Sequence, residues 1–176
     1  MGARTVLHDA DITRALTRIA HEILESNRGS ENLVLLGIPT RGVALAQRLA
    51  RLIGEIAQTS VPVGALDVTL FRDDLAKHPT RSPHPTDIPA GGIDGRTVVL
   101  VDDVLFSGRS IRAALDALQS IGRPAVVRLA ILVDRGHREL PIRPDFVGKN
   151  IPSSRQERVN VRLREYDDAE EVTIEA

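Results

Sequence analysis

The stretch from Val98 to Ser110, VVLVDDVLFSGRS, constrains the fold of this 176-residue chain more than any other part. Its first four residues, Val98 to Val101, are apolar and predict a strand buried on both faces, which Asp102 and Asp103 are expected to end. The polar loop that follows predicts the start of an amphipathic helix. A buried strand that leads through a short loop into a helix is the repeating unit of α/β proteins. The stretch therefore predicts a parallel sheet covered by helices.

The loop at the start of this helix is suited to binding an anion. Backbone N–H groups at a helix N-terminus point toward a bound phosphate, and Ser107, Arg109 and Ser110 add hydroxyls and a guanidinium. Gly108 lets the backbone approach the ligand closely. The acidic pair before the loop would repel a phosphate, so it is expected to serve ribose hydroxyls or the waters of a bound Mg²⁺. Taken singly, the same residues are also typical of a strand end and a helix cap.

The rest of the chain predicts further pairs of strands and helices. Apolar residues at helical spacing predict one helix from about Asp9 to Gly29, and a second reaches about Ile56 after the loop Gly37–Gly42. This alternation predicts an α/β fold, a mainly parallel sheet with helices on both faces. A small hood is expected from a lid loop and the segment after Val133. Further strands are expected at residues 33–36, 61–71, 126–133, 146–147 and 158–164.

The lid is expected between Arg72 and Gly92, where apolar periodicity is lost. A connection of about twenty residues without secondary structure is too long for a passive loop in a compact domain. A mobile lid over an active site is one interpretation, and a disordered insertion is the other. The prolines of this stretch are Pro79, Pro83, Pro85 and Pro89.

Composition and charge limit the class of protein. The length suits a single domain spanning residues 1–176, and the absence of Cys excludes disulfides and thiolate metal sites. No apolar run is long enough to span a membrane, so a cytoplasmic protein is expected. Residues 123–164 hold ten Lys and Arg against four Asp and Glu, whereas the acidic C-terminal tail, residues 165–176, holds six acids and no base. The basic segment permits an anionic partner, although on charge alone a solvated surface is the simpler interpretation.

Several segments resemble known families. The stretch Val98–Ser110 resembles the phosphoribosyl diphosphate (PRPP) binding motif of type I phosphoribosyltransferases, in which two acidic residues precede a Thr/Ser-Gly loop that holds the 5′-phosphate. From about Ile12 to about Val161, the chain resembles the bifunctional pyrimidine operon regulators and uracil phosphoribosyltransferases. Four motifs carry this resemblance, and the motif nearest the C-terminus distinguishes this family from other phosphoribosyltransferases. The matching motifs are Leu36–Gly42, Leu70–Leu75, Leu132–Arg143 and Val147–Pro152.

The resemblance implies a reaction in which uracil and PRPP give UMP and diphosphate, with Mg²⁺ as cofactor. Thr40 and Arg41 would contact the diphosphate. The acidic pair would orient the ribose and the magnesium waters, and Arg72 and Arg135 would border the uracil pocket. The implied substrate-binding residues are Thr40, Arg41, Arg72, Asp102, Asp103, Val104, Leu105, Phe106, Ser107, Gly108, Arg109, Ser110 and Arg135. Among these, Arg41, Asp102 and Asp103 would be catalytic, with Asp102 and Asp103 also holding the metal through water or PRPP.

The same resemblance implies a second activity, the binding of pyrimidine operon leader RNA. Because the chain has only one Tyr and three Phe, such contacts are expected through basic and hydroxyl groups rather than through base stacking. Relatives assemble as dimers or tetramers, so a homo-oligomer is expected. The positions that match the RNA-contacting residues of the family are Thr17, Arg18, His137, Arg143 and Lys149.

Two alternatives remain open at this point. Related purine phosphoribosyltransferases place a carboxylate, a proposed general base, where this chain has Phe106. A phenyl ring cannot accept a proton, so no general base is assigned. A purine phosphoribosyltransferase is the alternative enzyme, and a regulator that senses nucleotides or PRPP without turnover is the non-catalytic alternative.

Overall fold

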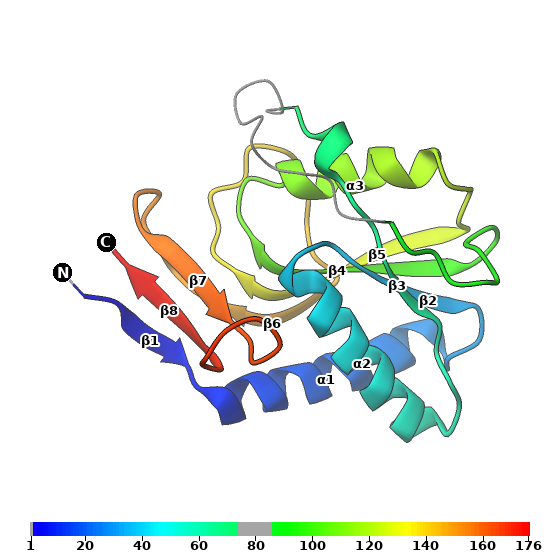
Figure 1. Ribbon diagram of the computed structural model, residues 1–176, viewed down its shortest axis with the longest axis horizontal. Coiled ribbons are helices and arrows are strands. Elements are labelled where there is room, and N and C mark those ends of the chain that lie inside the picture. The colour runs from blue at the N-terminus through cyan, green and yellow to red at the C-terminus, as the bar shows by residue number, and fades with distance from the viewer. Residues whose placement is uncertain (1, 74–85) are drawn as a thin grey trace.

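The computed structural model describes residues 2–73 and 86–176 and shows a sheet with helices around it (Figure 1). The helices are α1 (Asp9–Asn27), α2 (Arg41–Ala57) and α3 (Arg109–Gln119), with a short 3-10 helix at Thr69–Phe71. The strands are β1 (Arg4–Leu7), β2 (Leu33–Gly37), β3 (Val63–Ala65), β4 (Thr97–Leu105), β5 (Val126–Asp134), β6 (Phe146–Asn150), β7 (Arg158–Arg162) and β8 (Glu171–Glu175).

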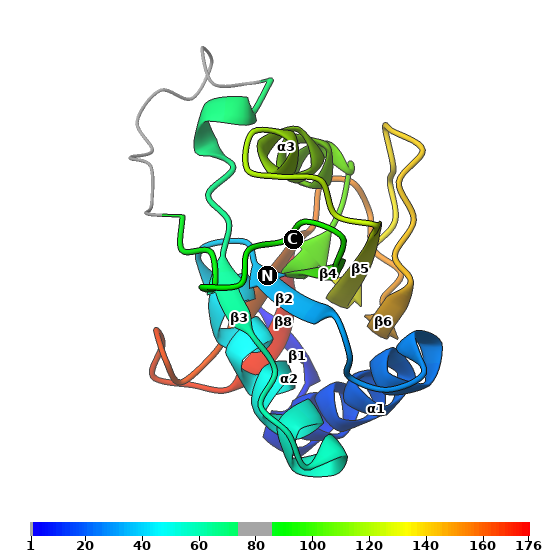
Figure 2. The same cartoon turned by 90° about the vertical axis from the view of Figure 1, so that its right-hand side faces the viewer.

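The central sheet contains five strands in the order β3-β2-β4-β5-β6, and every neighbouring pair is parallel. Helices α1 and α2 pack on one face and α3 packs on the other (Figure 2). The predicted parallel sheet with helices on both faces is therefore confirmed. Strand β4 lies in the middle, where Val99 and Val101 face the α1 and α2 side while Val98 and Leu100 face the α3 side.

A second sheet forms the hood. It has three antiparallel strands in the order β1-β8-β7, so the two ends of the chain lie side by side (Figure 1). The prediction of which segments form the hood was therefore wrong in part, because it did not include the N-terminal strand β1. Residues 165–176 do not form a tail either, since β8 is the middle strand and buries Val172 and Ile174.

Two strands differ in length from the sequence expectation. β4 does not end at the acidic pair but continues to Leu105, because β5 pairs with it along its whole length as far as Asp134. Residues 61–71 form only the three-residue strand β3 before the chain turns into the 3-10 helix. The side chain of Asp67 accepts hydrogen bonds from the backbone N–H and the hydroxyl of Thr69, and this local pairing favours a turn over an extended strand.

Part of the predicted lid, residues 74–85, lies outside the described residues. Just beyond it, Asp87 forms an antiparallel bridge with Ala65 at the end of β3. Among the helices of the described residues, none is both long and apolar enough to cross a lipid bilayer.

Candidate functional site

The parallel register brings three loops to one edge of the central sheet. Gly37, the last residue of β2, lies opposite Val101, and the last residues of β4 and β5, Leu105 and Asp134, lie opposite each other. Ligands of open α/β sheets bind at this edge, outside the carboxyl ends of the strands. The loops after β2, β4 and β5 are therefore the parts of the fold that can form a site together.

A cavity of about 210 Å³ lies between the loop after β2 and the end of β4. It brings together seven of the residues expected to bind substrate. The residues that line it are Ile38, Pro39, Thr40, Arg41, Val68, Arg72, Asp102, Asp103, Val104 and Ser110.

The acidic pair is held by its own backbone at the wall of this cavity. Oδ1 of Asp102 accepts a hydrogen bond from the N–H of Asp103 at 2.8 Å, and Oδ1 of Asp103 accepts one from the N–H of Val104 at 2.8 Å. Both residues are half-buried. These bonds restrict the orientation of each carboxylate before a ligand arrives, which is the preorganisation that electrostatic catalysis needs.

Two glycines let the loop after β2 lie directly against β4. A Cβ at Gly37 would be 2.4 Å from the carbonyl oxygen of Gly42, and a Cβ at Gly42 would be 2.5 Å from the carbonyl oxygen of Val101. Any side chain at either position would therefore force the loop away from the strand. The peptide bond between Pro39 and Thr40, within the same loop, is cis.

The loop from Ser107 to Ser110 leads into α3 as predicted, but the Arg109 side chain does not line the cavity. Gly108 has a φ of +94°, a conformation that favours glycine, and the N–H of Arg109 donates to Oγ of Ser107 at 3.2 Å. The Arg109 guanidinium donates instead to Asp73 at 2.6 Å and to Glu139 at 2.9 Å. In this structure the backbone and the hydroxyls, rather than that guanidinium, are available to an anion at the helix N-terminus.

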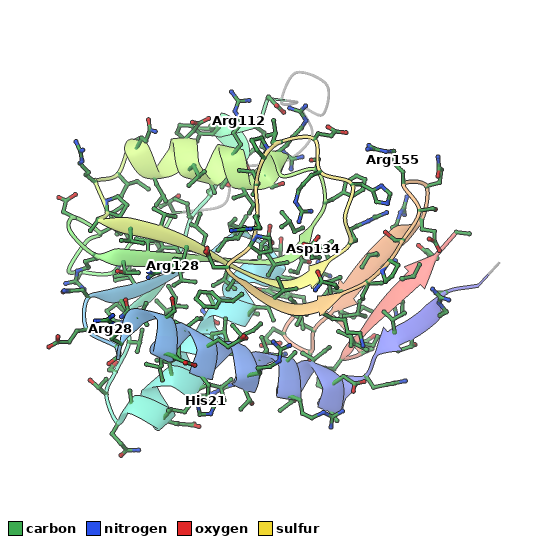
Figure 3. The ribbon with its side chains drawn as sticks, turned by 180° about the vertical axis from the view of Figure 1, so that it is seen from behind. His21, Arg28, Arg112, Arg128, Asp134 and Arg155 are labelled. Atoms are coloured by element: carbon green, nitrogen blue, oxygen red, sulfur yellow. The ribbon has the colours of Figure 1, made fainter. Side chains whose placement is uncertain are left out.

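Arg135 lies beside a second cavity, not the first. Its side chain is buried over the Phe106 ring, with Cζ 4.3 Å from the ring centroid, and it donates to the carbonyl oxygens of Ser154 and Glu157. Burial lowers the pKa of this guanidinium. The cavity has a volume of about 450 Å³ and lies at the end of β5, where Figure 3 labels Asp134. Its lining residues are Asp134, Arg135, Gly136, His137, Arg138, Asn150, Ile151 and Pro152.

Arg18, one of the residues expected to contact RNA, joins α1 to the edge strand β6. Its guanidinium donates to the carbonyl oxygens of Val147 at 3.1 Å and Gly148 at 2.6 Å, and it pairs with Glu22. Figure 3 views the side of the molecule on which α1 and β6 lie together. The neighbouring Thr17 donates its hydroxyl to the carbonyl of Thr13 in the same helix.

The other three expected RNA contacts lie on β6 or next to it. Lys149 is an exposed residue of β6, and the exposed Arg143 precedes that strand by three residues. Nε2 of His137 lies 2.6 Å from the carbonyl oxygen of Ser153, and His137 lines the same cavity as Asn150, the residue after Lys149. The fold therefore gathers these residues around one sheet edge.

Sequence reasoning missed the acidic turn between β7 and β8, residues 163–170. Arg48 of α2 pairs with Glu165 and Glu170, and Asp167 accepts two hydrogen bonds from Arg41, one of the predicted site residues. A signal was available in the sequence, because Arg41 and Arg48 are seven residues apart and thus share one face of a helix. Nothing local in the sequence indicates which carboxylates face them.

The pairing of Glu170 gives a stability prediction. Its side chain is 5% exposed, and the hydrogen bond from Arg48 lowers its pKa below the ordinary value of 4.5. We expect Glu170→Gln to lower the free energy of unfolding by about 2 kcal/mol at pH 7. A carboxyl with a lowered pKa stabilises the fold above its unfolded pKa, so the difference between the two proteins should shrink as the pH falls below about 4.5. Urea unfolding at pH 7 and at lower pH measures this, and a difference that does not change with pH would contradict it.

Comparisons with solved structures place the fold among phosphoribosyltransferases. A hypoxanthine-guanine phosphoribosyltransferase from Bacillus anthracis aligns over 98% of each chain with a TM-score of 0.73 and 15% identity. A hypoxanthine phosphoribosyltransferase from Staphylococcus aureus aligns over 96% of this chain and 90% of its own, with a TM-score of 0.70 and 19% identity. At these identities the likeness concerns the fold and not the substrate.

Sequence comparisons are more specific. The model of the phosphoribosyl transferase domain family matches residues 3–165. A "Bifunctional protein PyrR" from Leifsonia xyli is 67% identical over 99% of this chain and 98% of its own length, and one from Streptomyces coelicolor is 62% identical over 99% and 90%. The chain therefore belongs to the phosphoribosyl transferase family and, within it, to the bifunctional PyrR proteins, which confirms the resemblance drawn from its motifs.

Proposed function

We propose that the cavity at the ends of β2 and β4 is where this chain transfers the ribosyl phosphate of PRPP to uracil. As a member of the bifunctional PyrR proteins, the chain is a pyrimidine regulator with uracil phosphoribosyltransferase activity. One observation supports the location. Thr40 and Arg41, the acidic pair, and Ser110 at the start of α3 all line a single cavity. These are the groups that a ligand with a phosphate at one end, a ribose in the middle and a diphosphate at the other end requires.

The proposed reaction forms a bond between N1 of uracil and C1′ of PRPP, while the bond from C1′ to the diphosphate oxygen breaks and diphosphate leaves. The proton of N1 is released to the departing diphosphate or to water. Positive charge develops on the sugar and negative charge on the diphosphate, so catalysis depends on positioning and electrostatics. The N-terminus of α3 holds the 5′-phosphate. Asp102 and Asp103 bind the ribose hydroxyls, and Arg41 stabilises the departing diphosphate.

The donor set around the acidic pair fits Mg²⁺ as part of the substrate complex. No group of three or more His, Cys, Asp or Glu side chains suited to a metal occurs among residues 2–73 and 86–176. Mg²⁺ typically binds through one or two carboxylates, several waters and substrate phosphates, so Asp102 and Asp103 would suffice as protein partners once PRPP is bound. When bound, the ion neutralises charge on the diphosphate.

The environment of Phe106 favours uracil over a purine. The carboxylate that serves as a proposed base in purine enzymes is replaced by a ring that packs against Arg135 and lies 5.9 Å from the His137 ring. Uracil N1–H is more acidic than a typical amide, so the transfer does not require a strong base at this position. The second cavity, beside Arg135, is the part of the site where we place the base.

Base selectivity tests the enzymatic proposal. When the protein is incubated with PRPP, Mg²⁺ and one of uracil, hypoxanthine, guanine or adenine, we expect nucleotide to form only with uracil, as UMP. Chromatography of the products measures this. Turnover of a purine would favour the alternative enzyme, and no turnover with any base would favour a sensor that binds PRPP or nucleotides without reaction.

We assign the binding of operon leader RNA to the surface made by α1 and β6, with Thr17, Arg18, His137, Arg143 and Lys149. The contact of Arg18 with the β6 carbonyls supports this assignment, because it brings basic residues from distant parts of the sequence to one place. Lys149 on β6 and Arg143 in the segment before it are exposed and can neutralise phosphates; Arg143 lies at the side of β6 toward α3, where it lines a cavity with Ile111 and Leu115.

A further inference from the structure

The acidic turn between β7 and β8 fixes the carboxylate of Asp167 through its own backbone. Oδ2 of Asp167 accepts a hydrogen bond from the N–H of Leu163 at 2.8 Å, and the N–H of Asp167 donates to the carbonyl of Leu163 at 2.7 Å. Leu163 itself is fully buried. The carboxylate is therefore part of a closed turn that is anchored in the hood.

A second set of ion pairs holds this turn against α2. Arg48 donates to Oε1 of Glu170 at 2.9 Å and pairs with Glu165. The Arg48 side chain is 15% exposed and that of Glu170 is 5% exposed, so water competes little for this contact. Arg48 thus keeps the turn in place independently of Arg41.

The turn meets Arg41 in a geometry that orients the guanidinium. Nε of Arg41 donates to Oδ2 of Asp167 at 3.2 Å, and Nη2 donates to Oδ1 at 2.8 Å. Two parallel hydrogen bonds fix the plane of the guanidinium as well as its distance. The contact raises the pKa of Arg41 and lowers the pKa of Asp167. A guanidinium has five N–H donors, so three remain for another partner.

Arg41 stands between two cavities. It lines the proposed PRPP site of about 210 Å³ and also a cavity of about 380 Å³ that is lined by Asp103, Asp167 and residues of β7. Without Asp167, the long Arg41 side chain would be able to adopt rotamers directed into either space. The side-chain entropy of arginine would then oppose its use in the site.

We propose that Asp167 is a positioning residue for the transfer reaction, which holds the Arg41 guanidinium in the orientation that receives the diphosphate of PRPP. This inference rests on the proposed function, because it uses the assignment of Arg41 to the diphosphate. Asp167 itself touches no reacting atom in the proposed reaction. Its effect passes entirely through Arg41, and this separates the proposal from a general role in the stability of the hood.

The test compares Asp167→Asn with a matched control in the same turn, Asp168→Asn, because the Asp168 side chain is exposed and takes no part in the ion pairs described above. The Asn side chain is nearly isosteric and keeps an oxygen for the N–H of Leu163, but it cannot accept both bonds from Arg41. We expect Asp167→Asn to lower kcat/KM for PRPP about tenfold, with the larger part of the loss in kcat, because the diphosphate gains charge in the transition state. Asp168→Asn removes the same charge from the turn and should stay within twofold of the original protein.

A double-mutant cycle asks whether Asp167 acts through Arg41. In an Arg41→Lys background, which keeps the charge but loses the planar fork, adding Asp167→Asn should change kcat/KM less than twofold. The inference is overturned if Asp167→Asn is active within twofold of the original, if it loses as much activity in the Arg41→Lys background as in the original protein, or if the Asp168→Asn control loses as much.

Calorimetric titration of PRPP, in the presence of Mg²⁺, into the same proteins distinguishes a failure of this inference from a failure of the proposed function. If the unsubstituted protein shows no uracil transfer, the proposed function has failed. The inference then depends on binding alone, and PRPP affinity should fall with Asp167→Asn and not with Asp168→Asn. Unchanged PRPP affinity in Asp167→Asn would overturn it under those conditions.

Discussion

Replacing Asp102 and Asp103 together with Asn is expected to lower uracil-dependent release of diphosphate from PRPP by at least about 100-fold. Asn keeps the size of Asp and its capacity to accept the backbone hydrogen bonds that hold the pair. It removes the charge that ribose hydroxyls and a magnesium ion require. Initial rates at saturating uracil and varied PRPP measure the effect.

A control with the same change of charge is available on the surface. Asp116 on α3 and Asp168 in the acidic turn are both exposed, and neither lines the cavity. The Asp116→Asn, Asp168→Asn double variant should keep nearly full activity. If the Asp102, Asp103 variant folds with an unchanged thermal midpoint and also keeps full activity, the assignment of the acidic pair is wrong.

The second large effect is expected on RNA binding. Each phosphate contact contributes about 0.7 to 0.9 to the slope of log affinity against log salt, so the double change Arg143→Gln, Lys149→Gln should flatten the slope by roughly 1.4 to 1.8. In 0.1 M salt this corresponds to a loss of affinity of about 25-fold or more. Uracil transfer should remain near normal, because neither residue lines the proposed PRPP cavity. Filter binding of operon leader RNA at several salt concentrations measures both quantities.

The control for RNA binding removes two positive charges elsewhere. Arg112 on α3, which pairs with Asp73, and Arg123 in the turn after it are exposed, and neither lines a cavity together with the residues expected to contact RNA. Changing both to Gln should leave the affinity and the salt slope close to those of the original protein. Equal losses in the two double variants would mean that net charge alone governs binding, and an unchanged slope in the Arg143, Lys149 variant would remove these residues from the RNA surface.

The central sheet could be predicted from the sequence because its signals are local. The apolar run of β4, the loop Gly37–Gly42 and the helix after Ser107 can each be recognised within a few residues. Parallel pairing then places the loops at one edge, so the gathering of Thr40 and Asp102 around one cavity follows from topology. The residues that the sequence predicts for substrate binding therefore include seven of the ten that line this cavity.

The hood could not be predicted in the same way. β1 has four residues, and β8 has three buried residues within an acidic segment, so neither is distinguishable from a solvated end of the chain. Arg4 pairs with Ile174, and contacts over such a separation leave no periodic signal in either partner. The same holds for Arg41 and Asp167, which are 126 residues apart. A single sequence shows the charges but not the partners.

The pairing of β1 with β8 also bears on how the chain is assembled during synthesis. Every strand of the central sheet precedes Ile151, so all of that sheet is synthesised before β7 and β8. β1, the first strand of the hood, therefore stays unpaired until β8 has been synthesised. We expect a released chain truncated before Glu171 to carry a formed central sheet and an unfolded N-terminal segment, which a protease would cleave near Arg4.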